Sequence, residues 1–143
     1  MGGINLTGAK VETSGFQYDR NWMLVDKNGK FLTQRIKPEM ALFRTEIQEN
    51  NLYVYHQSNQ HNGIEIPFNQ SSGKKIKSQV WDDPVEALLV SPAADAWFSM
   101  QLNRPCQLIK MDMNNKRYIE NKYKVNNEYV SFADSMPFLI IGQ

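Results

Sequence analysis

Short apolar and aromatic runs, separated by turn-forming residues, dominate the pattern along this chain. Residues 17–26 (QYDRNWMLVD) and 30–35 (KFLTQR) flank an Asn28-Gly29 pair. Such a pair between two strand-like runs is typical of a hairpin with a type I′ turn, because both residues tolerate a positive φ. The sequence therefore predicts a β-hairpin here.

Further runs downstream continue this extended pattern. Residues 41–48 and 52–56 predict a second hairpin, and the polar stretch 57–63 predicts a loop. Strands are then expected at 64–68, at 75–80 and at 108–111. In the run at 75–80 lysines alternate with other residues, which is typical of a strand at a sheet edge or facing solvent.

One segment has the pattern of an α-helix, the run PAADAWFSMQL at residues 92–102. Ser91 is a suitable N-cap, and Pro92 suits the first helical turn. Four residues at helical spacing predict the buried stripe: Ala93, Ala96, Trp97 and Met100. We therefore expect a mostly β protein, an antiparallel β-barrel-like domain with one or two short helices, one of them near residues 92–102.

Composition limits the size and the class of the protein. With 143 residues, 41% of them hydrophobic, the chain has enough apolar material for a single core. Sixteen Lys and Arg against fifteen Asp and Glu give a net charge of +1, which excludes an overall charge excess for binding polyanions. One cysteine excludes an internal disulfide framework, and two histidines argue against a metal cage.

Targeting and membrane signals are not recognised in the sequence. No run approaches the roughly 18 to 20 apolar residues of a membrane span, and residues 1–10 lack the features of a signal peptide. We therefore expect a cytoplasmic protein that binds neither membrane nor nucleic acid.

Residues 15–43 (GFQYDRNWMLVDKNGKFLTQRIKPEMALF) resemble the N-terminal β-barrel domain of MOSC proteins. That family has a Gly-aromatic step, Asp-Arg-x-aromatic, a hydrophobic strand, a Gly turn and Thr-x-Arg-x-x-Pro. The matching positions are Asp19, Arg20, Trp22, Gly29, Thr33, Arg35 and Pro38. Blocks at 80–87 and 132–142 and the helix containing Trp97 agree as well, so the resemblance covers nearly the whole chain.

The resemblance implies one part of a molybdenum-cofactor protein. Residues 1–131 correspond to the N-terminal barrel, and 132–143 to the start of the following MOSC domain or its linker. The apolar run at 138–141 predicts a strand and a chain that continues into that domain, which carries the cysteine ligand of molybdenum. We expect the chain alone to be inactive and not to bind the cofactor tightly.

Three functions are compatible with this resemblance. In the first, the full protein reduces N-hydroxylated compounds with molybdenum cofactor (molybdopterin) and receives electrons from a redox partner, as the amidoxime-reducing component and bacterial hydroxylaminopurine-detoxifying reductases do. In the second, the chain is the N-terminal part of a cofactor sulfurase-type protein. In the third, the barrel is a non-enzymatic binding or interaction module.

Arg20 is the strongest candidate for a binding residue. A guanidinium offers a planar fork of donors that matches phosphate oxygens, and the neighbouring Asp19 can orient it. In the family the arginine of the Asp-Arg motif contacts the terminal phosphate of molybdopterin, and the match transfers that role to Arg20. The alternative is an Asp19–Arg20 structural ion pair at the entrance of a strand.

Thr33 and Arg35 are candidates for a supporting role. They are expected on the strand across the Asn28-Gly29 turn, where two-residue spacing directs both side chains to one face. They either line the pocket of Arg20 or, as we favour, support the barrel end and the domain junction. Asp134 is expected to hold the junction, and no residue is expected to be catalytic.

Other reactive or charged residues are assigned structural roles. Cys106 is expected to be a small buried residue, and His56 and His61 surface residues without a third ligand. Residues 104–124 carry a local charge of +4 with interleaved tyrosines. We interpret this segment first as a solvated loop, second as a surface that attracts a partner or cofactor, and only third as a nucleic-acid site. Trp22, Trp81 and Trp97 are interpreted as core anchors.

Overall fold

The structure is a computed structural model that describes residues 3, 4 and 6–138. Its strands are β1 (Val11–Glu12), β2 (Gly15–Phe16), β3 (Trp22–Val25), β4 (Phe43–Ile47), β5 (Asn51–His56), β6 (Asn59–Pro67), β7 (Lys75–Val80), β8 (Asp83–Leu89), β9 (Gln107–Met111), β10 (Arg117–Tyr118) and β11 (Tyr129–Val130). Its helices are α1 (Pro92–Gln101) and the 3₁₀ turns η1 (Pro38–Leu42) and η2 (Asn121–Tyr123). The predicted mostly β class is confirmed. The strand predicted at 138–141 lies almost entirely outside the described residues.

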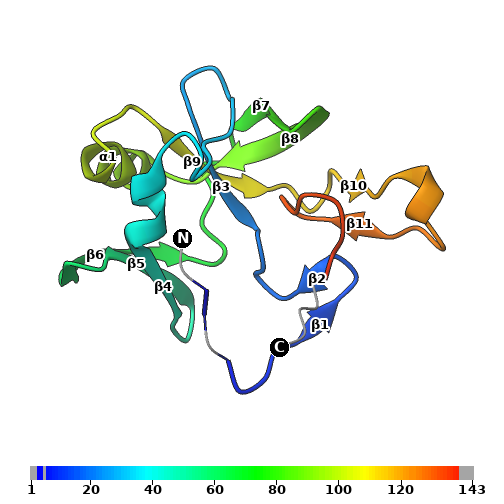
Figure 1. The fold of residues 1–143 in the computed structure, drawn as a ribbon, viewed down its shortest axis with the longest axis horizontal. Helices are drawn as coiled ribbons and strands as arrows, with labels where there is room; N and C mark the ends of the chain where they lie inside the picture. Colours follow the sequence, from blue (N-terminus) through cyan, green and yellow to red (C-terminus); the bar gives the residue numbers. More distant parts are fainter. Residues whose placement is uncertain (1–2, 5, 139–143) are drawn as a thin grey trace.

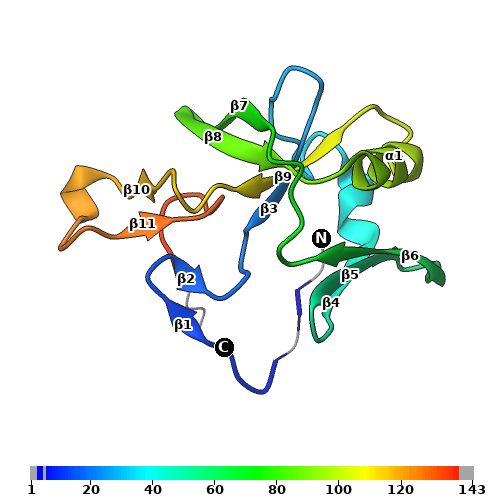
Figure 2. The ribbon, with the colours of Figure 1, turned by 180° about the vertical axis from the view of Figure 1, so that it is seen from behind.

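Two antiparallel sheets form a curled half-barrel. One has the strand order β3-β9-β8-β7, and the other has the order β4-β5-β6. In Figures 1 and 2, α1 and η1 lie at the same end of the molecule, where the two sheets approach each other. Two ribbons, β1-β2 and β10-β11, lie at the opposite side, away from α1.

Buried side chains cover both faces of the four-stranded sheet. On β3, Leu24 faces the first core and Val25 the second, because successive side chains of a strand point to opposite faces. Leu108 and Ile109 of β9 alternate in the same way. The first core is completed by β4, β5, β6 and α1, and the second by Phe132 near the end of the chain.

Helix α1 confirms the predicted helix but not its predicted buried face. The Ser91 hydroxyl accepts a hydrogen bond from Ala94 N at 3.2 Å, as an N-cap should. The buried residues are Ala94, Phe98 and Leu102, whereas Ala93 and Ala96 are exposed and Met100 is 64% exposed. Of the predicted stripe only Trp97 packs against the core, and the other three positions were wrong, because the helix is rotated so that Asp95 Oδ1 accepts from Leu108 N at 2.7 Å.

The Asn28-Gly29 turn brings Phe31 opposite Val25, but its geometry differs from the prediction. Gly29 alone has a positive φ of 77°, and the Asp26 carboxylate accepts from the backbone of Asn28 and Lys30. The type I′ assignment was therefore wrong, because Asn28 lacks the positive φ that such a turn requires at both central residues. Beyond Phe31 the chain turns at residues 34–36 instead of continuing as a strand.

The second hairpin is confirmed as β4-β5, while the loop predicted at 57–63 was wrong. Residues 59–63 belong to β6, which pairs with β5. The Tyr53 hydroxyl donates to Gln60 O at 2.7 Å and accepts from Gly63 N at 3.1 Å. A polar segment is therefore held extended by its partner strand. The lysine-rich strand β7 lies at a sheet edge, as predicted.

Among the residues described, none of the helices has both the length and the apolar character needed to span a membrane.

Candidate functional site

The Asp-Arg motif lies in the tight connection between β2 and β3. Tyr18 has a φ of 67° and Arg20 a φ of 51°, conformations that are uncommon for residues other than glycine. Asp19 Oδ2 accepts from Arg20 Nε at 2.8 Å and pairs with Nη2 at 2.7 Å. The Arg20 side chain is 37% exposed, so its guanidinium is oriented by a neighbouring carboxylate and still open to solvent.

This motif is joined to residues 131–137, which we call the exit segment. Asp19 O accepts from the Ser131 hydroxyl at 2.9 Å, and Arg20 O accepts from Phe132 N at 3.0 Å. Arg20 Nη2 donates to Pro137 O at 3.2 Å. The first and last parts of the described chain therefore form one structural unit.

Gly15 explains how the exit segment approaches so closely. Its φ is 126°, and a Cβ atom at this position would stand 2.7 Å from Pro137 O. Only glycine combines that φ with room for the carbonyl of another segment. The Gly-aromatic step of the sequence pattern thus has a structural reason.

Arg117 holds the other side of the exit segment. It is buried on β10, and its Nε and Nη2 donate to Asp83 Oδ2 at 3.1 and 2.6 Å. The same guanidinium donates to the carbonyl oxygens of Ser131, Ala133 and Asp134. Sequence reasoning missed this role of Arg117 because Asp83 lies 34 residues away and the other acceptors are backbone atoms of a distant segment.

Trp81 also contacts the exit segment. Its Nε1 donates to Asp134 Oδ1 at 3.0 Å, so Asp134 joins the exit segment to the β7–β8 turn. The prediction that Trp81 is a core anchor was wrong, because the residue is at the tip of that turn and 43% exposed. Trp22 and Trp97 do pack against the first core.

Thr33 and Arg35 line a surface groove of about 320 Å³, which we call the Trp81 groove. Its other lining residues are Lys30, Phe31, Ile36, Gln79, Trp81 and Asp82. The prediction that Thr33 and Arg35 lie on a paired strand was wrong, because Thr33 O accepts from the backbone of Ile36 and Lys37 and closes a turn. Neither Asp19 nor Arg20 lines this groove, and a role of Thr33 and Arg35 in supporting Arg20 stays a prediction.

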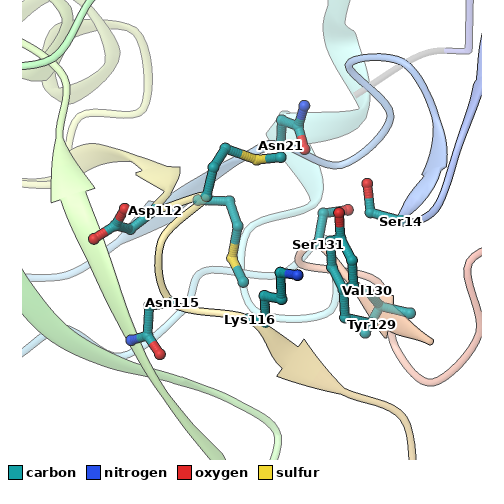
Figure 3. Close-up of a pocket in the computed structure, with 10 residues that line it drawn as sticks. Ser14, Asn21, Asp112, Asn115, Lys116, Tyr129, Val130 and Ser131 are labelled. Atoms are coloured by element: carbon teal, nitrogen blue, oxygen red, sulfur yellow. The ribbon is translucent and has the colours of Figure 1, made fainter. Parts of the chain in front are cut away.

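A second hollow lies between β9 and the β10-β11 ribbon. Figure 3 shows Lys116 extending between Asn115 on one side and Tyr129 and Ser131 on the other. Its volume of about 10 Å³ accommodates a single water molecule. This hollow is therefore far too small for an organic cofactor.

The basic segment 104–124 has less free charge than its composition indicates. Arg117 is buried, and Lys110 donates to the carbonyl of Phe68 with its Nζ 5.7 Å from the Trp22 ring. Three further lysines lie over tyrosine rings at 4.6 to 4.8 Å: Lys116 over Tyr129, Lys122 over Tyr123 and Lys124 over Tyr118. These cation–π contacts tie the charges to the segment's own aromatic residues.

Cys106 is buried, as predicted. The Ser99 hydroxyl donates to Cys106 O at 3.1 Å and accepts from Cys106 N at 3.0 Å, and burial raises the pKa of the thiol. His56 is paired with the Ser58 hydroxyl through Nδ1 at 2.6 Å. Over the described part of the chain, no three His, Cys, Asp or Glu side chains are grouped so that they could hold a metal ion.

Comparison with known proteins gives a consistent picture. Residues 1–105 match the family model described as the MOSC N-terminal beta barrel domain. Human molybdenum cofactor sulfurase is 30% identical over 122 residues, which cover 84% of this chain and 14% of that protein. The sulfurase of Bombyx mori is 26% identical over 145 residues, which cover 96% of this chain and 18% of that protein. The chain thus spans less than a fifth of either relative.

One solved structure resembles the fold. The solution structure of a Bordetella bronchiseptica protein superposes with a TM-score of 0.56 at 17% sequence identity. The match covers 77% of this chain and 92% of that protein. At this identity the likeness concerns the fold alone.

Proposed function

Because the chain belongs to the MOSC N-terminal β-barrel domain family, we propose that it is one part of a molybdenum cofactor sulfurase-type protein. In that protein it helps to hold the phosphate end of the molybdenum cofactor and shapes the mouth of the pocket. The MOSC domain of the same protein is its partner.

The observation that carries this proposal is the exposed, oriented guanidinium of Arg20. Nε and Nη2 are engaged by Asp19 Oδ2, Nη2 also donates to Pro137 O, and Nη1 has no hydrogen-bond partner among the described residues while the side chain is 37% exposed. A phosphate oxygen is a strong partner for the remaining Nη1, because the charge-assisted hydrogen bond needs no further ordering of the arginine. Asp19 is then a positioning residue.

The described residues fit the phosphate end of the cofactor and nothing more of it. A single arginine supplies only part of a phosphate site, and the larger of the two hollows does not include Arg20. The remaining phosphate donors would come from residues outside this chain, and the metal ligand from the MOSC domain. When bound, the cofactor supplies the molybdenum chemistry, and this domain's contribution is binding and orientation.

The relatives favour the sulfurase among the enzymatic alternatives, because those named above are molybdenum cofactor sulfurases. Reduction of N-hydroxylated compounds, with its electron-transfer partner, stays a prediction from the resemblance. The two activities are separated by assaying the full-length protein for sulfuration of the cofactor and for reduction of N-hydroxylated bases. Reduction without sulfuration would overturn the sulfurase assignment.

The role of Arg20 is tested by the cofactor content of full-length variants. Loss of a charged hydrogen-bond partner costs about 1.5 to 3 kcal/mol, so we expect Arg20→Ala to retain about tenfold less cofactor or lower. Arg20→Lys keeps the charge but loses the fork and should be intermediate. Arg44→Ala is the matched control, because the Arg44 side chain on β4 donates hydrogen bonds to Ala41, Phe43 and Gln57, none of which belongs to the Asp-Arg motif or the exit segment. Cofactor content equal to wild type in both Arg20 variants would remove Arg20 from the site.

A further inference from the structure

The Trp81 groove combines an aromatic surface with unneutralised positive charge. The Trp81 ring contacts Phe31 edge to face at a centroid distance of 5.3 Å, and the Arg35 guanidinium carbon lies 5.6 Å from the indole centroid. Because Trp81 is 43% exposed, part of the indole remains accessible from the groove. Such a surface is suited to stacking of a planar ring.

The two cations of the groove lack acidic partners. Within the described chain, neither Lys30 Nζ nor the Arg35 guanidinium forms an ion pair with a carboxylate. Arg20 and Arg117 differ in this respect, since each is held by an aspartate. Lys30 and Arg35 therefore have no carboxylate partner among the described residues, and Arg35, although it lies over the indole, keeps its donors for an anionic ligand.

The backbone of Trp81 is in an unfavourable conformation. Trp81 and Asp82 form the two-residue connection between β7 and β8, and Trp81 has a φ of 54°. Glycine or asparagine is usual at such a position, because a bulky side chain is strained there. Strain of this kind is often retained where a side chain has a functional role. The hydrogen bond to Asp134 fixes the indole at the edge of the groove.

From these observations we infer that the Trp81 groove binds a small planar aromatic compound that carries a phosphate, of the size of a nucleoside monophosphate. The ring packs against the exposed part of the Trp81 indole beside Arg35, and the phosphate is bound by Lys30 and Arg35, with Thr33 also in the lining. The groove volume of about 320 Å³ is at the lower end of small-molecule sites. Asp82 in the lining and the net charge of +1 disfavour a long polyanion.

The inference is tested by titrating the ¹⁵N-labelled chain with GMP and following the indole N–H resonance of Trp81. We expect that resonance to shift at submillimolar GMP. Guanosine lacks the phosphate and inorganic phosphate lacks the ring, so each should bind about tenfold more weakly or less. An unchanged Trp81 resonance at millimolar GMP, or guanosine binding as tightly as GMP, would overturn the inference.

Variants separate the two halves of the site. Arg35→Gln should weaken GMP about tenfold, while the matched control Arg44→Gln should leave GMP binding unchanged. Trp81→Gly removes the ring and relieves the strained turn, so it should lose GMP binding without loss of fold; Trp81→Phe, which keeps a ring, should retain part of it. Wild-type affinity in Arg35→Gln or Trp81→Gly contradicts the inference.

The groove site is also distinguishable from the site of the proposed function. Arg20→Ala should bind GMP as wild type does, because Arg20 does not line the groove. Loss of GMP binding in Arg20→Ala would mean that the phosphate binds at Arg20 and not in the groove. Conversely, unchanged cofactor content in the full-length Arg20 variants leaves the groove result standing.

Discussion

Arg20 Nη2 lies 3.2 Å from the carbonyl oxygen of Pro137, a residue 117 positions further along the chain. The guanidinium therefore has two tasks at once, since it also pairs with Asp19. The position of the Arg20 guanidinium is thus coupled to the position of the exit segment.

Gly15→Ala should disrupt this coupling. The new Cβ would stand 2.7 Å from Pro137 O at a φ of 126°, so the exit segment must move or the backbone must change. We expect a loss of about 2 kcal/mol in the free energy of unfolding, measured by urea denaturation. Limited proteolysis within residues 131–137 should become faster. Gly8→Ala, with nothing within 4 Å of its Cβ, is the control, and equal effects of the two changes would contradict the explanation.

Arg117→Ala should be the more destabilising of the changes at the exit segment. It leaves Asp83 without its buried cation and three carbonyl groups of residues 131, 133 and 134 without their donor. Asp83 is 58% exposed and becomes solvated, so the main cost is that of buried carbonyl groups left without a donor, about 1 to 3 kcal/mol each. Arg117→Lys keeps the charge but cannot reach all these acceptors and should recover only part of the loss. Urea denaturation measures both; a loss below about 1 kcal/mol in Arg117→Ala would contradict this role.

Local signals made part of this fold predictable. The Ser91-Pro92 start of α1 and the β4-β5 hairpin depend on neighbouring residues, and both were predicted from them. The edge position of β7 followed from its alternating lysines. The polar strand residues 59–63 were not predictable, because their extended form depends on Tyr53 of the adjacent strand.

In the candidate site, too, some residues could be predicted from the sequence and others could not. The match to a family motif indicated Arg20 and Asp19, which the structure shows as a pair. The exposure of Trp81 was missed, because an apolar run gives no sign that its last residue lies on a turn. The network of Arg117 was missed since its acceptors are backbone carbonyls, which have no sequence signature.

Lys110 should make the folded protein more stable as the pH rises into the alkaline range. Burial lowers the pKa of Lys110 below its ordinary value of 10.5. Between the folded-state pKa and 10.5 the unfolded chain binds more protons, so this residue makes the free energy of unfolding rise with pH. Lys110→Met removes that contribution. Urea denaturation from neutral pH upward measures the free energy of unfolding of both proteins. As the pH rises, the value for wild type should increase relative to the value for Lys110→Met. A difference that does not vary with pH would contradict the assignment.

Asp95 should fix the rotation of α1 because its carboxylate oxygen accepts a hydrogen bond, and not because the residue is negatively charged. Its Oδ1 accepts from Leu108 N at 2.7 Å, and burial raises the pKa of this carboxyl group. Asp95→Ala leaves the partly buried Leu108 N–H without a partner, which costs about 1 to 3 kcal/mol. Asp95→Asn keeps an acceptor oxygen and avoids the buried charge, so it should cost much less. Urea denaturation at neutral pH compares the two variants. Equal losses would show that the negative charge of Asp95, and not its acceptor oxygen, stabilises the contact between α1 and β9.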